Sequence, residues 1–470
     1  MSRIVVLGAG PLGLATSMLL TDEGHDVVVL ERDPQPCPAS PEEAWESWDR
    51  HGVAQFRQAH YLHPGVRPLL ETSFPDVVKT LESSGAVAFN ALSLMPPSVT
   101  DRSPRPGDER FVTLTARRPV IEYAFASVAA PRQDVRRGVH VTALRCDSES
   151  APGVPHVDGV RLATGEEIAA DLVIDATGRR SKLPEWIRAI GGRAVVEEAQ
   201  DYGFVYYTRF FRARGDVPTM RAPLNTPVGS ISILTLPADS GTWSVTVYIS
   251  SDDTLLKTLR EADRWTAAVA ACPRHAHWLD GEPLTDVLPM AGAADRRRSF
   301  VVDGTPVATG VLAIGDAWAA TNPSLGRGIT LGLKHVLVTA QALREHADDP
   351  LALARRHDEL TNAQILPWYQ NTVDVDRGRA AAIRAAIDGT PPPVSDDPRA
   401  VASRELAVAM LYDADVFRAF AEIMSLVTPP AEVMSRPGLG QRIHQVASDN
   451  EPPPYVGPSR ADLLQIAGAA

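Results

Sequence analysis

The sequence predicts an α/β protein that combines a parallel sheet, a mixed β-sheet and a helical carboxyl-terminal region. Three observations support this fold class. An apolar run broken by glycines occupies residues 4–20, apolar residues alternate with period two between residues 200 and 300, and helical spacing follows residue 335. A chain of 470 residues is long enough to fold as more than one lobe.

The first element is a strand, a glycine turn and a helix, in the order that a dinucleotide site needs. Residues 8–13 read Gly-Ala-Gly-Pro-Leu-Gly, with a β-branched apolar run before them and a helical stretch after them. Gly8 permits the tight turn, Gly10 lets the backbone approach a pyrophosphate, and Gly13 lets the helix lie close to the strand. The amino end of the helix then offers free N–H groups to the phosphates.

A second strand, residues 26–30, ends at Glu31, 18 positions beyond Gly13. Its carboxylate can accept hydrogen bonds from a ribose diol and would repel a 2'-phosphate, so FAD or NAD fits better than NADP. The motif leaves FAD and NAD open as alternatives, and a purely structural glycine turn is the other interpretation.

Two later blocks repeat the change from a buried strand to a glycine turn. Residues 170–186 contain Asp175 and Gly178, and residues 310–333 contain the pair Gly315-Asp316, a Pro/Gly loop and an expected helix. At these residues the chain resembles the flavoprotein monooxygenases of the para-hydroxybenzoate hydroxylase type. The resemblance extends over most of residues 1–345.

The resemblance implies a Rossmann-type FAD-binding domain with an inserted mixed β-sheet substrate domain and a helical carboxyl-terminal region. The expected boundaries are 1–190 for the first part of the FAD-binding domain, 191–300 for the substrate domain, 301–345 for the second FAD-binding part and 346–470 for the helical region.

Specific roles toward FAD follow from the resemblance. Asp316 would accept a hydrogen bond from a ribitol hydroxyl, and the backbone of Pro323, Gly326 and Gly328 would pass beside the isoalloxazine ring. A helix beginning near Ile329 would direct its amides at the flavin, where the reduced ring carries negative charge.

Arginines complete the expected cofactor site. An arginine that opens a helix contacts the FAD phosphates in the family, and it matches Arg118, with Arg117 as the less favoured alternative and a structural salt bridge as the other interpretation. Arg32, directly after Glu31, is also assigned to the cofactor.

Residues 50–65 and 200–213 look like segments of bacterial flavin-dependent epoxidases and hydroxylases that act on polyketide-type natural products. Gln55, Arg57 and His60 match the family pattern Gln-x-Arg-x-x-His, which implies that Arg57 lies near the flavin. His60 would either face the active cavity or serve a structural role.

Two residues depart from the family pattern. Trp318 stands where a small or aliphatic residue is usual, and Arg327 replaces the common Gln or His. Arg327 would either stabilise the reduced flavin or substrate, or point to solvent. The candidate catalytic residues are therefore Arg57, His60 and Arg327.

The period-two pattern between residues 200 and 300 predicts a sheet, and the helical spacing after residue 335 predicts helices. In the expected sheet, one face would pack on helices, and the other would cover the flavin with aromatic and aliphatic groups, which favours an apolar substrate. Residues 389–398 are expected to form an exposed connector between helices, and residues 400–427 another helical stretch.

The chain composition limits other functions. The 46 basic and 58 acidic residues leave a formal charge of −12, which disfavours binding to nucleic acid or anionic lipid surfaces. No apolar stretch reaches the roughly 18 residues that span a bilayer, and the opening run lacks a secretory cleavage site, so no membrane insertion is expected.

The cysteines and histidines predict no metal site. Cys37, Cys146 and Cys272 are far apart and form no C-x-x-C pair, which favours a reducing, cytoplasmic setting. His275 and His277 lie two positions apart on an expected loop and are interpreted as surface residues.

The resulting hypothesis is an FAD-dependent monooxygenase that transfers one oxygen atom from O2 to an apolar natural product through a flavin C4a-hydroperoxide. With a single G-x-G-x-x-G motif, electrons would come from transiently docked NADH or NADPH, or from a separate flavin reductase. The alternatives are a reductase of the geranylgeranyl reductase type and a non-catalytic FAD-binding accessory protein. A halogenase is disfavoured because no W-x-W-x-I-P stretch is present.

Overall fold

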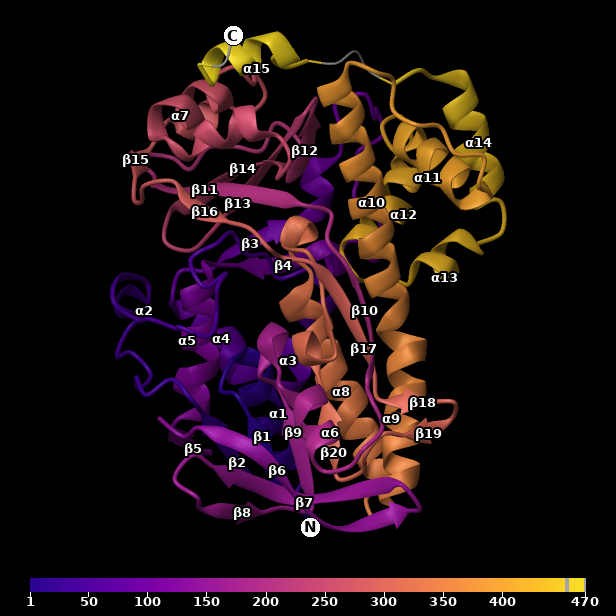
Figure 1. The fold of residues 1–470 in the computed structure, drawn as a ribbon. Coiled ribbons are helices and arrows are strands. Elements are labelled where there is room, and N and C mark those ends of the chain that lie inside the picture. The colour runs from indigo at the N-terminus through magenta and orange to yellow at the C-terminus, as the bar shows by residue number, and fades with distance from the viewer. Residues whose placement is uncertain (453–455, 469–470) are drawn as a thin grey trace.

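The computed structural model describes residues 1–452 and 456–468, and Figure 1 shows two lobes flanked by long helices. The lower lobe is built on a parallel sheet with the strand order β20-β9-β1-β2-β5. Its strands are β1 (Arg3–Leu7), β2 (Asp26–Glu31), β5 (Asp134–Arg137), β9 (Leu172–Asp175) and β20 (Val311–Ala313). The expected strand–turn–helix–strand at the start of the chain is confirmed.

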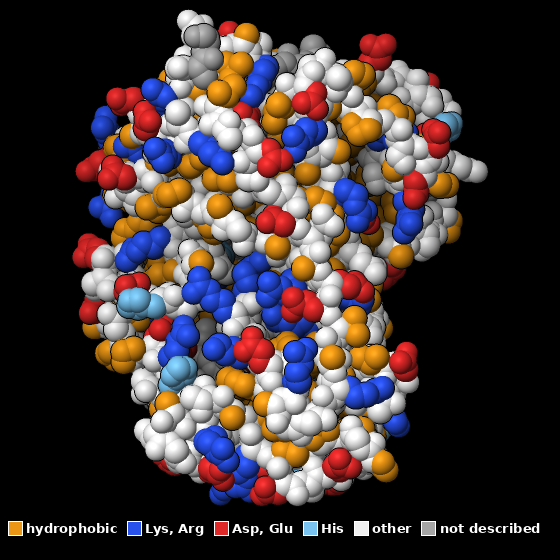
Figure 2. All heavy atoms as spheres, in the orientation of Figure 1, with side chains coloured by type: hydrophobic (Ala, Val, Ile, Leu, Met, Phe, Trp, Pro, Cys, Tyr) orange, Lys and Arg blue, Asp and Glu red, His pale blue; other side chains and the backbone are white. Residues whose placement is uncertain are grey.

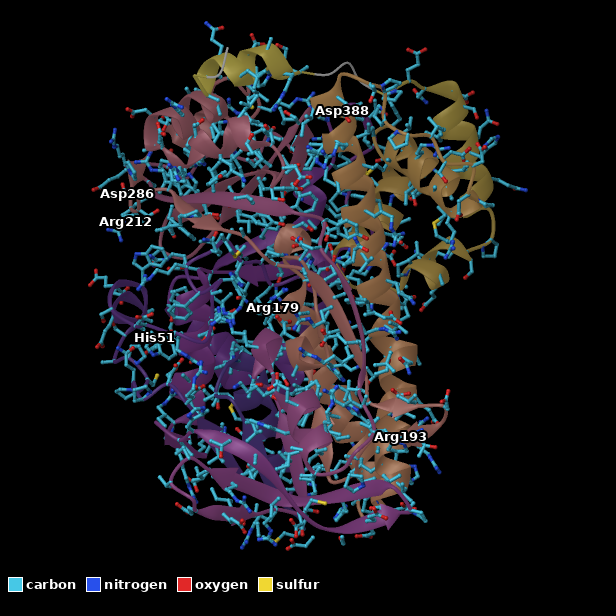
Figure 3. All side chains as sticks on the ribbon, viewed as in Figure 1. His51, Arg179, Arg193, Arg212, Asp286 and Asp388 are labelled. Carbon is cyan, nitrogen blue, oxygen red and sulfur yellow. The ribbon has the colours of Figure 1, made fainter. Side chains whose placement is uncertain are left out.

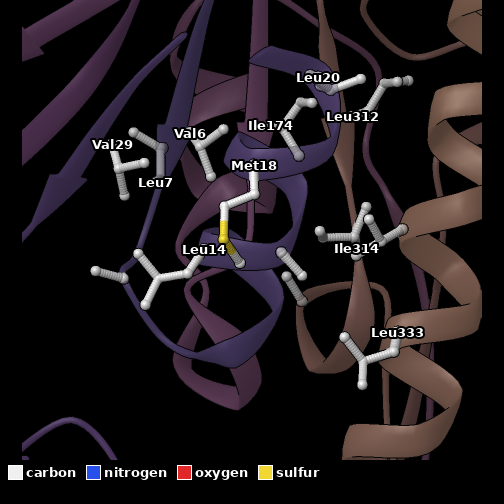
Figure 4. Packing of buried hydrophobic residues seen from close by; sticks show 14 of the residues in the cluster. Val6, Leu7, Leu14, Met18, Leu20, Val29, Ile174, Leu312, Ile314 and Leu333 are labelled. Atoms are coloured by element: carbon white, nitrogen blue, oxygen red, sulfur yellow. The ribbon is translucent and has the colours of Figure 1, made fainter. Parts of the chain in front are cut away.

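Helices α1 (Pro11–Asp22), α5 (Arg118–Ala129) and α8 (Gly328–His346) pack together in this lobe. Figure 4 shows the core between α1, the sheet and α8, where Leu14 and Met18 contact strand residues such as Val6 and Ile174. These strands are buried along nearly their whole length, as expected for a parallel sheet covered by helices.

The upper lobe contains an antiparallel sheet with the order β12-β13-β14-β11-β15, and β16 also pairs with β11. The strands are β11 (Phe204–Arg212), β12 (Asn225–Val228), β13 (Ile231–Pro237), β14 (Thr242–Ser250), β15 (Glu282–Pro283) and β16 (Leu288–Met290). One face packs against α7 (Ala262–Ala270) and α15 (Arg460–Ile466), so the expected helix-covered face is confirmed.

The other face of this sheet is more polar than expected. Tyr206, Thr208, Thr246 and Tyr248 lie on it, and all four side chains are buried. Hydroxyl groups therefore accompany the aromatic residues where the sequence pattern suggested an aromatic and aliphatic cover.

Two antiparallel strands connect the lobes. The chain leaves the lower lobe through β10 (Val196–Gln200) and returns through β17 (Asp295–Ser299), which pair along their full length and run side by side in Figure 1. The short β21 (Ala319–Ala320) pairs with β17 as the third strand. A further antiparallel sheet of β6 (Val141–Ala151), β7 (Val154–Leu162) and β8 (Glu167–Ala169) lies at the base of the lower lobe.

Helices dominate the chain after residue 328. They are α9 (Pro350–Gln364), α10 (Leu366–Asp388), α11 (Pro398–Ala409), α12 (Ala414–Met424), α13 (Pro430–Met434) and α14 (Leu439–Asp449). The expected helical stretch 400–427 is two helices, because Asp413 caps α12 and starts a new helix there. Figure 1 shows α10 running from the lower lobe to the upper one. Within the residues that the structure describes, no helix is long and apolar enough to cross a membrane.

The remaining elements complete the two lobes. They are the helices α2 (Pro41–Glu46), α3 (Arg67–Ser73), α4 (Pro75–Ser83) and α6 (Leu183–Ala189), and the strands β3 (Val87–Asn90), β4 (Val112–Thr115), β18 (Val301–Val302) and β19 (Thr305–Pro306).

The expectation that His275 lies on the surface is wrong, because the imidazole is only 1% exposed. The short turn Ala276–Leu279 folds back against α7 and carries Trp278 into the core, which covers His275 as well. Burial lowers the pKa of His275 to about 4, so the ring is neutral at physiological pH.

A buried ion pair joins the two lobes. Arg117, directly before α5, donates from its backbone N–H (2.7 Å) and from Nε and Nη2 to the carboxylate of Asp239, which lies between β13 and β14. Both side chains are at most 4% exposed.

We expect Arg117→Ala to lower the free energy of unfolding by about 3–5 kcal/mol, because it leaves the Asp239 carboxylate buried without its cation. Urea unfolding of the purified protein measures the effect. The control is Arg132→Ala, whose partner Asp22 is exposed and which should cost less than about 1 kcal/mol. An equal effect of the two substitutions would contradict the structural role of the buried pair.

Candidate functional site

A cavity of about 310 Å³ lies where the two lobes meet. Its wall is formed by the carboxyl ends of β1, β2, β9 and β20, by the segments around residues 52–60 and 290–293, and by residues 321–329. Figure 2 shows a hollow at mid-height with Lys and Arg side chains gathered around it. A cavity at the carboxyl ends of parallel strands is the usual place for a ligand in this type of sheet.

The glycine turn forms one end of the cavity. Gly8 has φ = +96°, and a Cβ there would lie 2.9 Å from the carbonyl oxygen of Ala176, so the position requires glycine. Gly10 lines the cavity, and a Cβ at this position would meet no atom within 4 Å. The first turn of α1 contains no acidic residue, which leaves its amino end suited to an anion.

Gly13 has a different role from Gly10. It is not part of the cavity wall, and a Cβ there would lie 1.8 Å from the carbonyl oxygen of Gly8. Its absent side chain therefore allows α1 to contact the turn, which agrees with the packing role expected from the sequence.

Glu31 and Arg32 line the cavity beside the end of β2. The carboxylate of Glu31 accepts hydrogen bonds from the backbone N–H groups of Ala9 (2.7 Å) and Asp33 (2.8 Å) and from Arg50 (2.9 Å). These donors fix the carboxylate at the cavity wall and leave it capacity for a further donor.

Arg50 is a central site residue that the sequence analysis missed. Its guanidinium is 4% exposed and lies within 3.1 Å of carboxylate oxygens of Glu31, Asp33 and Glu122. It also donates to the carbonyl of Ala9 in the glycine turn. Its position in the Arg-His-Gly segment gave no local signal for this role, because all of its partners come from other elements.

Arg118 and His60 form one hydrogen-bonded unit in the cavity wall. Arg118 donates to Glu122 (2.6 Å) and to Nε2 of His60 (2.9 Å). Because a guanidinium only donates, Nε2 accepts, and the ring proton is on Nδ1, which donates to the carbonyl of Gln58 (3.0 Å). The salt bridge of Arg118 is confirmed, and because the residue also lines the cavity, its contact with FAD phosphates stays a prediction.

The same contacts restrict the chemistry of His60. Burial and the positive charge of Arg118 lower its pKa to about 3. Both ring nitrogens are occupied by protein partners, so His60 orients Arg118 in this arrangement and has no free nitrogen for proton transfer.

Arg57 and Arg117 are engaged away from the cavity wall. Arg57 donates to the carbonyl oxygens of Trp45 and Trp48, and its guanidinium stacks 5.3 Å from the centre of the Trp45 ring. Arg117 binds Asp239. Neither residue is part of the cavity wall.

The block that begins at Asp175 shapes the next part of the wall. Asp175 is fully buried and accepts hydrogen bonds from Thr177 and Ser181, which hold the turn after β9. Arg179 extends from this turn into the space between the lobes, as Figure 3 shows. It donates to the carbonyl oxygens of Ala294 (2.6 Å) and Thr321.

Asp316 follows β20 and faces the cavity. Burial raises the pKa of its carboxyl group, although Arg179 and Arg118 oppose the shift. Among the residues that the structure describes, none donates a hydrogen bond to this carboxylate. The turn after β9 lies beside it, because a Cβ added to Gly178 would be 4.0 Å from the Cβ of Asp316. The glycine turns and Asp316 therefore share one groove, with an acceptor available to a ligand.

Residues 321–328, which we call the cavity loop, form the far wall together with Ile329. Pro323, Gly326 and Gly328 all line the cavity, and Gly326 has φ = +64°. Helix α8 begins at Gly328, so its first N–H groups lie at this wall. The expected contact of these residues with the flavin ring stays a prediction.

The two departures from the family pattern have structural explanations. Trp318 is 5% exposed and packs edge-on against His335, with 5.3 Å between ring centres. Arg327 is 1% exposed, so the interpretation that it points to solvent is wrong. Its guanidinium donates to Asn371 and Thr372 of α10, and burial lowers its pKa to about 10.

We expect His60 to make the protein less stable in acid. Its pKa is about 3 when folded and 6.5 in the reference state, so the unfolded chain binds the proton more strongly between these values. The free energy of unfolding should therefore fall as the pH drops below about 6.5. Between pH 7 and 5, urea unfolding should show a loss about 1–2 kcal/mol larger in the wild type than in His60→Gln.

The control for this measurement is His51→Gln, because His51 is largely exposed. It should leave the pH dependence of the wild type unchanged. An identical pH dependence in His60→Gln would show that the buried ring does not control acid stability.

Comparisons with known proteins agree with this architecture. A family model described as an NAD(P)-binding Rossmann-like domain matches residues 6–71. Protein Rv3254 of Mycobacterium tuberculosis is 29% identical over 359 residues, which cover 70% of each chain. The menaquinone reductase of Mycolicibacterium smegmatis is 26% identical over 358 residues, covering 72% of this chain and 76% of that protein.

Three solved structures show the same fold. The anhydrotetracycline hydroxylase OxyS of Streptomyces rimosus has a TM-score of 0.56 and 20% identity, and the match covers 90% of this chain and 76% of that chain. PqsL of Pseudomonas aeruginosa, a probable FAD-dependent monooxygenase, has a TM-score of 0.59 and 16% identity, with 82% of this chain and 99% of that chain covered. The myxobacterial chondrochloren halogenase CndH has a TM-score of 0.60 and 16% identity, with 98% of this chain and 99% of that chain covered. The chain therefore has the α/β fold of FAD-dependent monooxygenases and halogenases, with a Rossmann-type domain at its amino end.

Proposed function

We propose that this chain is an FAD-dependent monooxygenase that hydroxylates or epoxidises a small organic molecule with O2. One observation carries the proposal: the glycine turn, Glu31, Asp316 and the cavity loop line a single cavity. Glu31, the glycine turn, Asp316 and the cavity loop suit the adenosine, pyrophosphate, ribitol and ring of FAD, in that order. The fold is one that FAD-dependent monooxygenases have, which supports the proposal.

The residues present fit FAD in their chemistry. Glu31 is fixed as an acceptor for the adenosine ribose, and Gly10 with the amino end of α1 suits the pyrophosphate. The Asp316 carboxylate would accept a hydrogen bond from a ribitol hydroxyl, and the cavity loop would contact the isoalloxazine ring. Arg32 and Arg118 add positive charge along the wall, opposite the two phosphate charges.

Bound FAD supplies the redox chemistry and the activation of oxygen, and the protein supplies binding, orientation and protection from water. The N–H groups at the start of α8 favour negative charge on the adjacent ring. Neutral His60 keeps Arg118 in place, and Arg179 connects the turn after β9 to the cavity loop. These roles require no nucleophilic triad.

The electron source in this proposal is transiently docked NADH or NADPH, or a separate flavin reductase. Mixing the FAD-loaded protein with each nucleotide under anaerobic conditions tests docking, because flavin absorbance is lost on reduction. If neither NADH nor NADPH bleaches the flavin, and turnover begins after a flavin reductase is added, the protein belongs to a two-component system.

A reductase is the second candidate, because the menaquinone reductase of M. smegmatis is similar over 72% of this chain. Its activity would consume the electron donor and hydrogenate an alkene without incorporating oxygen. Incubation under ¹⁸O₂ with candidate polyketide-type and quinone substrates separates the two functions: one ¹⁸O atom in the product supports the monooxygenase, and a reduced product free of ¹⁸O supports the reductase.

We expect Gly10→Val to abolish FAD binding without unfolding the protein. The new side chain has room in the fold but occupies the cavity where the pyrophosphate would lie. The dissociation constant for FAD, measured by flavin fluorescence, should rise at least 100-fold, and the free energy of unfolding should change by less than about 1 kcal/mol.

Gly215→Val serves as the matched control, since a Cβ at Gly215 also meets no atom within 4 Å and the residue is outside the cavity wall. It should bind FAD like the wild type. Normal FAD affinity in Gly10→Val would contradict the placement of the pyrophosphate.

We expect Asp316→Ala to weaken FAD binding about 10- to 150-fold, which corresponds to the roughly 1.5–3 kcal/mol of a hydrogen bond to a charged group. The apoprotein should not lose stability, because the carboxylate has no hydrogen-bond donor among the described residues and carries a burial cost. Equilibrium FAD titration and urea unfolding measure the two effects. Unchanged FAD affinity would remove Asp316 from the cofactor site.

A further inference from the structure

The cavity loop is attached to elements that lie far from it in the sequence. Helix α10 provides the most extensive of these attachments, through residues 44 to 52 positions further along the chain. No sequence motif indicates this connection, and the expected cofactor contacts do not involve α10.

Arg327 makes the first attachment. Its Nη1 donates to Oδ1 of Asn371 (2.8 Å) and to Oγ1 of Thr372 (3.0 Å), which are neighbours on α10. Nη2 lies 3.7 Å from Sδ of Met424 at the end of α12. Burying a guanidinium is costly unless its N–H groups have partners, and here two helices supply partners for Nη1 and Nη2.

Ser324 makes the second attachment. Its hydroxyl donates to Oδ1 of Asp376, one turn further along α10 than Thr372. Asp376 is 1% exposed, and burial raises the pKa of its carboxyl group to about 7. The loop is thus held at two points, three residues apart, by one helix face.

Other contacts hold the remaining sides of the loop. The amide oxygen of Asn322 accepts a hydrogen bond from the hydroxyl of Tyr206, and its backbone N–H donates to Asp295 (2.7 Å). The imidazole of His63 lies 2.9 Å from the carbonyl oxygen of Leu325. These contacts hold the loop to other segments, and the hydrogen bonds of Ser324 and Arg327 connect it to α10.

We propose that Arg327 and Asp376 are positioning residues, which hold the cavity loop against α10 so that the loop presents its backbone to the flavin ring. The proposal rests on the proposed function for the ring, and it assigns Arg327 a role through the loop rather than by contact with the reacting atoms. It also makes the helical region of α10 and α12 part of the cofactor site.

The test uses the full-length apoprotein and two ligands. ADP fills only the adenosine and pyrophosphate end of the cavity, whereas FAD also requires the loop. In Arg327→Met and Asp376→Ala, the FAD dissociation constant should rise about tenfold while the ADP dissociation constant stays within a factor of two. Equal weakening of both ligands, or no weakening of FAD, would overturn the proposal.

Hydrogen–deuterium exchange of the apoprotein provides a readout that needs no ligand. Peptides that contain residues 321–328 should exchange at least tenfold faster in both variants, and α1 peptides should be unchanged. Asp374→Asn is the control, because Asp374 lies on the same helix but forms an exposed pair with Arg377. Unchanged exchange of the loop in both variants would contradict the proposal.

Arg327→Lys and Asp376→Asn keep the test informative if the larger truncations do not fold. Lys reaches fewer acceptors than the guanidinium, so Arg327→Lys should show the same selective FAD loss in weaker form, whereas Asp376→Asn retains an acceptor for Ser324 and should restore most of the affinity. Absence of FAD and ADP binding in the wild type would refute the proposed function, while the exchange experiment would still decide the positioning role.

Discussion

The close contact between Gly13 and the carbonyl oxygen of Gly8 sets the geometry on which the site depends. A Cβ at Gly13 would lie 1.8 Å from that oxygen, so only glycine lets α1 approach the turn after β1. Once α1 is there, its amino end faces the carboxyl ends of β1, β9 and β20. The turn at residues 176–180 follows β9 and Asp316 follows β20, which is why residues separated by most of the chain line one cavity.

The charged groups of this cavity differ in whether they have a charged partner within the protein. Arg50 and Arg118 together face Glu31, Asp33 and Glu122, and every one of these buried groups has a charged partner within 3.1 Å. Burying such charges costs several kcal/mol each unless partners compensate. In this network the ion pairs between the arginines and the carboxylates compensate that cost. Asp316 differs, because its nearest cations act at longer range and it has no described donor. That difference marks Asp316 as a ligand-facing group.

The sequence predicts features whose physical cause is local. The glycine turn and Glu31 are predicted from neighbouring residues, because turn geometry and strand ends are encoded locally, whereas Asp316 and the cavity loop are implied by the resemblance to flavoprotein monooxygenases. Arg50 was missed, and the partners of Arg57, Arg117 and Arg327 could not be assigned, because each depends on segments brought together only by folding. An arginine in a motif shows that a charge is present but not which element receives it.

The hydroxyl-rich face of the upper sheet follows from the same non-local packing. Thr208 binds Gln58 and Thr246, Tyr206 binds Asn322, and Asn225 connects Tyr248 to the carbonyl of Ser324. This face therefore supports the cavity loop through hydrogen bonds instead of forming an open apolar cover. Gln55, Ala59, His60 and residues 290–293 line the same cavity as the loop. Tyr206 and Tyr248 are not part of the cavity wall; their hydroxyl groups bind Asn322 and Asn225 instead.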